Sequence, residues 1–332
     1  MPTDFTRTEI QSQADAWQNA LDTLDTQQHA LRSLWADAKA DVLIFTGCGS
    51  TYYLSQIAAN LAQQQTGVIA RGVPASELLL HPTSLYPAKS KPLMVAISRS
   101  AATTETIQAV RAFRQAYHAP VVVISCYADR PLNLEATLNL AVPAGQEESV
   151  AQTRSFSSML VLAEGLAALW GGQVTQNEPL AGHEFVQWAS AFAEPLADPT
   201  RYTRYFYLGS GPRYGLACEA MLKMKEMSLT HAEAFHPMEF RHGPKSMVDE
   251  QTLVVGLLSE TGYAEEKAVL DEMRQLGATT INISPHPNAD FVVPDRQMVH
   301  YLPPLQWMAY HRAIKKALDP DRPRNLEQVV QL

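Results

Sequence analysis

The sequence predicts an α/β fold made of two tandem, related domains, each a parallel sheet flanked by helices on both faces. Segments predicted as strands, such as Val42–Thr46, are apolar throughout, which is typical of parallel strands covered on both sides. They alternate with segments of helical periodicity, as α/β proteins do. The same order of segments recurs after about 160 residues, which indicates a tandem duplication.

The first half opens with a helical region from about Thr8 to Ala38, which contains no helix breaker. Alternating apolar strand and amphipathic helix patterns follow. Strands are predicted at Val42–Thr46, Leu93–Ser98, Val121–Ser125 and Leu138–Val142, and helices at Thr51–Gln64, Ala75–Leu80, Thr103–Tyr117 and Thr153–Trp170.

The second half repeats these patterns. Tyr205–Pro212 matches Leu43–Ser50, Thr252–Ser259 matches Lys91–Ser98, Thr280–Ser284 matches Val121–Ser125, and His300–Pro303 matches Leu140–Pro143. Helices are predicted at Arg213–Ser228 and Glu265–Leu276. The polar stretch Gly171–Pro179 predicts the boundary between domains 1–175 and 176–332. Asp319–Asn325 is too rich in proline for a helix and predicts an ordered loop or arm.

Composition excludes several classes of function. With 332 residues, the chain is long enough for two domains of about 150 residues each. A net charge of -8 argues against nucleic-acid and anionic-membrane partners. The three cysteines show no metal-ligand or disulfide spacing, which predicts a cytoplasmic protein. No signal segment or run of apolar residues long enough to cross a membrane is present in the sequence given.

Two loops predict a phosphate site. Gly47–Thr51 (Gly-Cys-Gly-Ser-Thr) and Ser98–Thr104 (Ser-Arg-Ser-Ala-Ala-Thr-Thr) each follow a strand and open a helix, where backbone N–H groups and hydroxyls can surround an anion. Arg99 could add a charge-assisted bond. The alternative is that Thr103 or Thr104 only caps the helix. Neither loop has the Gly-Lys-Ser/Thr of a nucleotide-binding P-loop.

The second half carries acid–base groups instead. Glu219, Lys223 and Glu226 share one helix face, so Glu226 is either part of a solvated ion-pair face or a base that moves a proton between adjacent carbons. His242 precedes Gly243-Pro244 and is either structural or suited to opening a sugar ring. His231 and His236 have no third partner, and no metal is predicted.

Seven motifs in order resemble the sugar isomerase (SIS) domain family. That family includes the isomerase half of glucosamine-6-phosphate synthase, stand-alone amino-sugar-phosphate deaminases, aldose/ketose isomerases and fructosamine-6-phosphate deglycases. The motifs are Gly47–Thr51, Ser98-Arg-Ser, Val150-Ala-Gln-Thr, Leu222–Glu226, His231–Phe235, Arg241-His-Gly-Pro and Pro323–Leu326.

The resemblance implies a role for each matching residue. The sugar-phosphate pocket would be lined by Cys48, Gly49, Ser50 and Thr51. The phosphate would be held by Ser98, Arg99, Ser100 and Thr103. The sugar would be contacted by Val150 and Gln152. Glu226 would shuttle the proton between C1 and C2, with Lys223 beside it. His242 would assist ring opening from the neighbouring subunit of a homodimer.

Three departures from the synthase pattern shape the prediction. No glutaminase domain precedes the sequence given, so ammonia is expected to be released rather than incorporated. Arg99 replaces a glutamine, and Ala101-Ala102 replaces Gly-Glu, which resembles the deaminase and isomerase members. Gln328 stands where the synthase has a lysine.

These features together predict an amino-sugar-phosphate deaminase/isomerase. It would convert glucosamine 6-phosphate, or galactosamine 6-phosphate, to a ketose 6-phosphate and ammonia without metal or organic cofactor. Three alternatives stay open: an aldose/ketose phosphosugar isomerase, a fructosamine-6-phosphate deglycase and a non-catalytic phosphosugar-binding regulator. No residue identified in the sequence reads the C4 hydroxyl, so the sugar epimer is left undecided.

Overall fold

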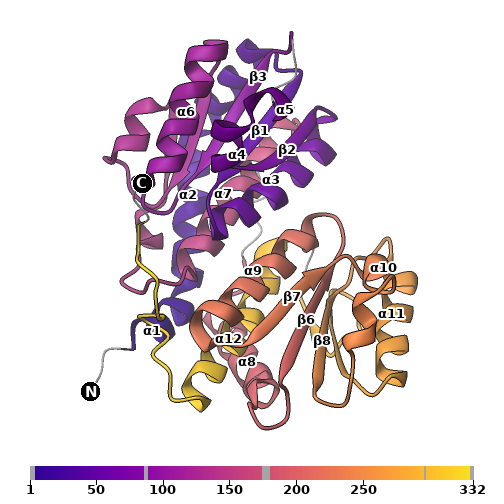
Figure 1. The fold of residues 1–332 in the computed structure, drawn as a ribbon. Helices are drawn as coiled ribbons and strands as arrows, with labels where there is room; N and C mark the ends of the chain where they lie inside the picture. Colours follow the sequence, from indigo (N-terminus) through magenta and orange to yellow (C-terminus); the bar gives the residue numbers. More distant parts are fainter. Residues whose placement is uncertain (1–3, 86–88, 174–179, 295–296, 330–332) are drawn as a thin grey trace. The chain divides into compact units, whose positions relative to one another are not determined.

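The computed structural model describes residues 4–85, 89–173, 180–294 and 297–329, which form two compact units (Figure 1). The first unit contains Ser12–Glu147, Arg154–Leu180 and Glu327–Leu332. The second contains Met1–Gln11, Glu148–Thr153 and Ala181–Leu326, and so takes in two short segments from early in the chain. The boundary predicted between residues 175 and 176 lies outside the described residues.

The first unit is a five-stranded parallel sheet in the order β2-β1-β3-β4-β5. Its central strands are completely buried, which explains their uniformly apolar sequences. The strands are β1 (Val42–Gly47), β2 (Ile69–Pro74), β3 (Pro92–Ile97), β4 (Val121–Ser125) and β5 (Leu138–Ala141).

Helices cover both faces of this sheet (Figure 1). On one face Ile44 and Met94 pack in a core with Phe113 of α6. The helices on that side are α4 (Ala75–Leu80) and α6 (Thr104–Tyr117), and those on the other are α2 (Gln13–Ala38), α3 (Ser50–Thr66) and α7 (Arg154–Trp170). Short connections are α5 (Pro82–Leu85), η1 (Pro131–Glu135) and η2 (Pro143–Gly145).

The second unit has the corresponding parallel sheet, in the order β10-β9-β8-β6-β7. Its strands are β6 (Arg204–Gly209), β7 (His231–Phe235), β8 (Thr252–Leu257), β9 (Thr279–Ser284) and β10 (Phe291–Val292). One core joins Phe206 and Val254 to Phe240 of α10 (Pro237–Phe240) and Val269 of α11 (Tyr263–Gln275).

The other face of the second sheet is covered by α9 (Pro212–Ser228) and α12 (Leu302–Lys315). Arg312 of α12 donates to the Tyr205 hydroxyl at 3.0 Å. The remaining elements of this unit are α1 (Phe5–Gln11), α8 (His183–Ala193), η3 (Glu194–Ala197), η4 (Pro244–Met247) and η5 (Met298–Tyr301). The predicted fold class, two α/β units with parallel sheets, is confirmed.

Matching glycines show the repeat at the level of the backbone. Gly49 and Gly211 each precede the first helix of their sheet and have nearly equal angles, φ 56°, ψ -124° and φ 55°, ψ -131°. This conformation strongly favours glycine. Gly47 and Gly209 end the preceding strands, where an added Cβ would lie less than 3 Å from the next helix. The close strand-to-helix turns of both units therefore require glycine at the same places.

The structure differs from the sequence predictions at several places. The helix predicted from Thr8 to Ala38 is two helices, α1 and α2, because Ser12 leaves the helical conformation (φ -94°, ψ 6°). Strands β2 and β7 were not predicted, since as edge strands they are only partly buried and carry mixed polarity. His300–Pro303 forms a helical turn into α12 rather than a strand, and the fifth strand of the second sheet lies earlier, at β10.

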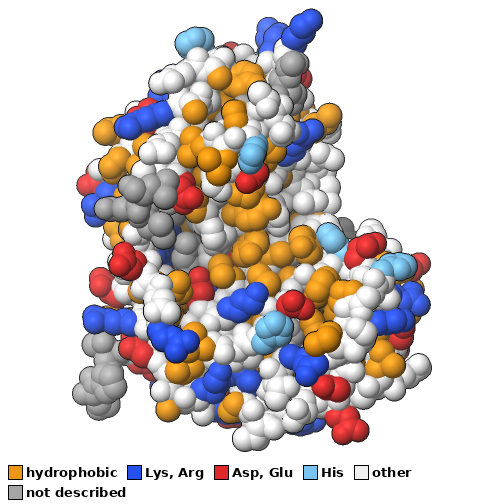
Figure 2. All heavy atoms as spheres, in the orientation of Figure 1, with side chains coloured by type: hydrophobic (Ala, Val, Ile, Leu, Met, Phe, Trp, Pro, Cys, Tyr) orange, Lys and Arg blue, Asp and Glu red, His pale blue; other side chains and the backbone are white. Residues whose placement is uncertain are grey.

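Helix hydropathy, the placement of possible metal ligands and the surface charges give three further observations. None of the helices in residues 4–85, 89–173, 180–294 and 297–329 combines the length and hydropathy needed to cross a bilayer. Within the same ranges, no group of three His, Cys, Asp or Glu side chains is placed to hold a metal ion. Acidic and basic side chains are interspersed over the face drawn in Figure 2, in line with the modest net charge.

Candidate active site

The two predicted phosphate loops leave the first sheet at the same edge. Strands β1 and β3 are parallel neighbours, with Thr46 opposite Ala96, so the residues that follow each strand lie at one carboxyl edge. From β1 the chain continues through α3 to β2 on one side of β1, whereas β3 lies on its other side. This reversal of strand order is where open parallel sheets form ligand crevices.

The loop at Gly47–Thr51 is closed by its own threonine. The Thr51 hydroxyl accepts from the Cys48 N–H at 3.0 Å and donates to the Cys48 carbonyl at 2.9 Å. Ser50 and Thr51 are both buried, at the first turn of α3. Thr51 therefore fixes the conformation of this loop. The N-terminus of α3, which carries a partial positive charge, begins at Ser50, directly after Gly49.

Cys48 lies in this loop as a neutral thiol. Its Sγ is 3.5 Å from the Thr106 hydroxyl. Burial, together with the nearby Glu105 carboxylate, raises the pKa of the Cys48 thiol to about 11. At neutral pH almost none of it is thiolate, the form that acts as a nucleophile. The predicted lining role of Cys48 is therefore one of contact, not of covalent chemistry.

In the second loop, two hydroxyls converge at the start of α6. Ser98 is buried, and its Oγ lies 3.5 Å from Thr103 Oγ1. Thr103 occupies the N-cap position, yet its side chain makes no capping hydrogen bond. Ser100 accepts from the Ala102 N–H at 3.2 Å, which helps to hold Ala101 at a positive φ of 49°. The loop presents hydroxyls beside a helix N-terminus, which is the arrangement that binds phosphate.

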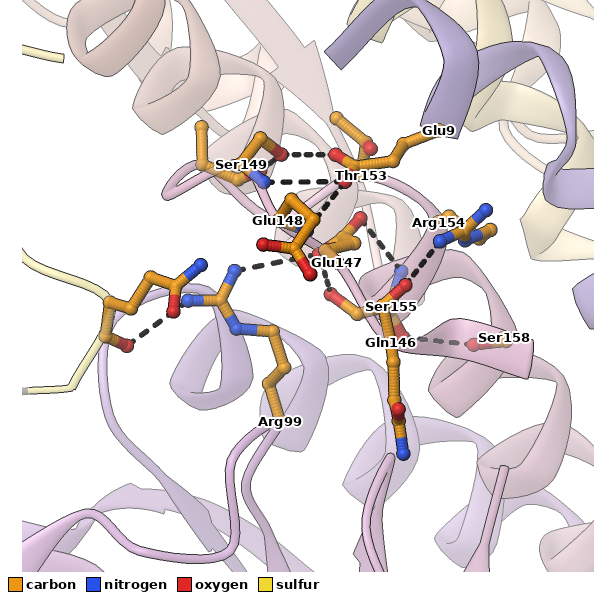
Figure 3. A network of polar contacts seen from close by, with 12 residues as sticks. Glu9, Arg99, Gln146, Glu147, Glu148, Ser149, Thr153, Arg154, Ser155 and Ser158 are labelled. Carbon is orange, nitrogen blue, oxygen red and sulfur yellow. Dashed lines mark hydrogen bonds and ion pairs between the residues drawn. The ribbon is translucent and has the colours of Figure 1, made fainter. Parts of the chain in front are cut away.

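Arg99 is engaged by other groups of the first unit. Its guanidinium lies 3.5 Å from the Glu147 carboxylate and donates to the Gln328 carbonyl at 3.0 Å (Figure 3). These residues border a cavity of about 160 Å³ together with Ser100 and Tyr127. The sequence singled out Arg99 but not Glu147, because nothing in the Glu147-Glu148 pair shows which carboxylate is buried. Direct phosphate binding by Arg99 stays a prediction.

The second unit contains a buried cluster of charges on α9. Lys223 Nζ lies 3.4 Å from Glu219 and also forms an ion pair with Glu226. The side chains of Lys223 and Glu219 are each 2% exposed, and that of Glu226 is 19% exposed. The alternative of a solvated ion-pair face is therefore wrong. Glu226 is a largely covered carboxylate beside a buried ammonium, and its role as a base stays a prediction.

The histidines of the second unit lie apart from this cluster in the chain. His242 is exposed in the turn after α10, and its N–H donates to the Glu239 carbonyl at 3.0 Å. The ring of His236 stacks on Tyr214 with centroids 4.0 Å apart. The catalytic role of His242 stays a prediction.

Val150 and Gln152 lie in segment 148–153, which the second unit contains. The Val150 N–H donates to the Asp321 carbonyl at 3.0 Å. Gln152 Oε1 is buried and accepts no hydrogen bond from the residues described. A buried acceptor of this kind normally has a partner, so it points to a hydrogen-bond donor supplied by a ligand or by water. Their contact with a sugar stays a prediction.

Comparison with known proteins gives a consistent result. A family model described as the SIS domain matches residues 38–169 and 201–292. The isomerizing glutamine–fructose-6-phosphate aminotransferase of Methanothermobacter thermautotrophicus is 28% identical over 330 residues, covering 93% of this chain and 55% of the relative. The protein of the same name from Idiomarina loihiensis is 27% identical, covering 98% and 58%. The chain spans about half the length of the curated relatives it matches.

Solved structures share the fold along nearly the whole chain. Glucosamine-6-phosphate deaminase from Thermotoga maritima has a TM-score of 0.79 and 27% identity, covering 95% of this chain and all of that one. Tagatose-6-phosphate ketose/aldose isomerase from Escherichia coli has a TM-score of 0.82 and 24% identity, covering 95% and 94%. Since the SIS model matches more than half of the chain and does so in both repeats, this protein belongs to the SIS domain family.

Proposed function

We propose that the chain is an enzyme acting on phosphosugars, which converts glucosamine 6-phosphate, or galactosamine 6-phosphate, to a ketose 6-phosphate and ammonia. The observation that carries the proposal is the buried cluster of Glu219, Lys223 and Glu226. Burying Glu219 and Lys223 and covering most of Glu226 costs free energy, and a regulator that only binds a phosphosugar needs no base. Likeness to a deaminase over 95% of this chain and all of that one supports ammonia release.

Substrate binding is assigned to the groups at the strand ends and in segment 148–153. The phosphate accepts hydrogen bonds from the hydroxyls of Ser98, Ser100 and Thr103, which lie at the N-terminus of α6. The pocket is lined by Cys48, Gly49, Ser50 and Thr51. Arg99, in the same loop as Ser98, adds a positive charge that helps to hold the phosphate. Val150 and Gln152 contact the sugar, and a sugar hydroxyl would supply the donor for Gln152 Oε1.

The proposed reaction needs only proton transfers and water. His242 protonates the ring oxygen while the C1 hydroxyl loses its proton, which gives the open-chain amino aldehyde. Glu226 removes the C2 proton while the aldehyde oxygen takes up a proton from water, which gives an enolamine. Return of the proton from Glu226 to C1 then leaves a hydroxyl on C1 and a protonated imine at C2. Water adds to the imine, the C2–N bond breaks, and a ketose 6-phosphate and ammonia leave. Lys223 balances the charge of Glu226 while the latter carries or loses the proton.

His242 is proposed to act from the partner subunit of a homodimer. Its exposed position in the turn after a four-residue helix leaves its ring available to a second copy of the chain. Mixing a Glu226→Gln chain with a His242→Ala chain would restore activity in heterodimers if the site is shared in this way.

Ammonia release from a panel of sugars tests the proposal. We expect release from glucosamine 6-phosphate or galactosamine 6-phosphate, with an equal amount of ketose 6-phosphate. No release is expected from unphosphorylated glucosamine, because the two loops at the edge of the first sheet then have no anion to bind. Isomerisation of an aldose phosphate without ammonia, or cleavage of fructosamine 6-phosphate, would replace the deaminase assignment. Tight binding with no turnover of any phosphosugar would contradict the proposal.

A further inference from the structure

Segment 148–153 has no regular secondary structure, yet a buried carboxylate fixes its start. Glu9, on α1, is only 3% exposed. Its Oε1 accepts from the Glu148 N–H at 2.7 Å and from the Ser149 N–H at 3.2 Å, and its Oε2 accepts from the Ser149 hydroxyl (Figure 3). A carboxylate accepting several such bonds holds its donors more firmly than neutral acceptors do.

Helix α1 is in turn held by Asp321, which lies in the loop after α12. The Asp321 carboxylate accepts from the N–H groups of Phe5 and Thr6 at 2.9 and 2.7 Å, and from the Thr6 hydroxyl at 2.7 Å. Asp321 also accepts from the Val150 N–H through its carbonyl, at 3.0 Å. Segment 148–153 is therefore held by two residues that are distant in the chain: Glu9, 140 positions before Ser149, and Asp321, which accepts from the Val150 N–H.

The far end of the segment is held as well. Gln306 of α12 donates from its Nε2 to the Thr153 carbonyl at 3.0 Å. Between these ties lie Val150 and Gln152, and Gln152 Oε1 is the buried acceptor that has no donor among the residues described. The backbone on both sides of that acceptor is thus fixed, which prepares its position before a ligand arrives.

We infer that Glu9 is a positioning residue, which holds segment 148–153 in place so that Gln152 can accept a hydrogen bond from a hydroxyl of the sugar. The inference rests on the proposed function, since it assigns the sugar part of a phosphosugar to this segment. Glu9 itself does not touch the substrate in this account. Glu9 contributes to binding of the uncharged, hydroxyl-bearing part of the ligand. It leaves phosphate binding unchanged, because that is assigned to the loops of the first unit.

Binding of two ligands that do not react separates these contributions. Glucitol 6-phosphate has hydroxyls and a phosphate but no carbonyl carbon, whereas inorganic phosphate has only the anion. In Glu9→Ala the N–H groups of Glu148 and Ser149 lose their acceptor, so calorimetry should show glucitol 6-phosphate binding weakened by about tenfold or more. Inorganic phosphate binding should stay within about twofold of the wild type, because the two sites are independent. Glu9→Gln keeps an acceptor oxygen, so glucitol 6-phosphate binding should be largely restored in that variant.

Glu266→Ala is the matched control. Glu266 is a carboxylate of the same unit, 4% exposed, that accepts from the Ser259 N–H at 2.6 Å and therefore holds a different loop. It should lose stability without a selective loss of glucitol 6-phosphate binding. Should Glu9→Ala fail to fold, Ser149→Ala removes the hydroxyl that donates to Glu9 and that also lies 3.2 Å from the Ala151 carbonyl of the same segment. The same selective weakening is expected.

The outcomes are distinct. Three results would overturn the positioning role and leave the proposed function in place. Binding of both ligands could weaken equally in Glu9→Ala or Ser149→Ala, or it could weaken in neither variant. The third is a loss of glucitol 6-phosphate binding in Glu266→Ala as large as that in Glu9→Ala. Absence of glucitol 6-phosphate binding by the wild-type chain would overturn the proposed function and this inference with it. A double variant adds one more check: if Glu9 acts through Gln152, Glu9→Ala should weaken binding much less in a Gln152→Ala background.

Discussion

Glu226→Gln is expected to lower kcat for ammonia release by about 10²–10⁴-fold, the usual contribution of a positioned general base. The amide keeps the shape of the side chain but cannot take the C2 proton. Lys223 would still have Glu219 at 3.4 Å, so the buried ammonium is not left alone. We therefore expect the unfolding temperature and the affinity for glucitol 6-phosphate to change little. Steady-state kinetics, thermal unfolding and calorimetry measure the three quantities.

Glu265→Gln is a suitable control for this variant. Glu265 is an exposed glutamate in the first turn of α11, in the same unit, and its loss should leave kcat unchanged. A Glu226→Gln enzyme with near wild-type kcat would show that another group removes the C2 proton. A variant that loses ligand affinity in proportion to activity would instead assign Glu226 to binding.

Lys223→Met is expected to give the largest loss of stability. The lysine side chain is 2% exposed and lies between Glu219 and Glu226. Removing the ammonium takes a counter-charge away from the buried Glu219 carboxylate, a change that costs about 3–5 kcal/mol of the free energy of unfolding. Urea unfolding at neutral pH measures the loss, and the denaturant midpoint should fall while the slope stays the same.

Two further variants separate charge burial from loss of side-chain volume. Lys225→Met changes an exposed lysine on the same helix and should have little effect. The double variant Lys223→Met/Glu219→Gln removes both buried charges and should recover a large part of the lost stability, because the destabilised carboxylate is gone. If Lys223→Met were as stable as Lys225→Met, the cluster would not be buried in solution as the structure describes it.

The sequence predicted those elements of the fold that are buried on both sides. Strands β1, β3 and β4 are continuous apolar runs because both faces of each strand lie in the core. The edge strands β2 and β7 have no such run, and the sequence patterns did not detect them, whereas the edge strand β5 was predicted from Leu138–Val142. The break at Ser12 has no proline or glycine to mark it, and arises where the chain passes from one unit to the other.

The residues of the candidate site could also be predicted only in part. Local loop chemistry identified Ser98 and Thr103, because strand, hydroxyl loop and helix are consecutive in the chain. Helical spacing placed Lys223 and Glu226 together. Glu9 and Glu147 were missed, since their partners lie far along the chain or in an irregular segment, and no periodic pattern connects a carboxylate to backbone N–H groups 139 and 140 residues away.

The fate of a deuterium label at C2 of glucosamine 6-phosphate tests the central claim, that the chain moves a sugar proton with Glu226, most directly. The wild-type protein should remove deuterium from C2, passing it to C1 or to water, with ammonia released alongside, and Glu226→Gln should leave the label in place. If the wild-type protein binds the labelled sugar phosphate but the deuterium stays at C2 throughout, the claim is contradicted.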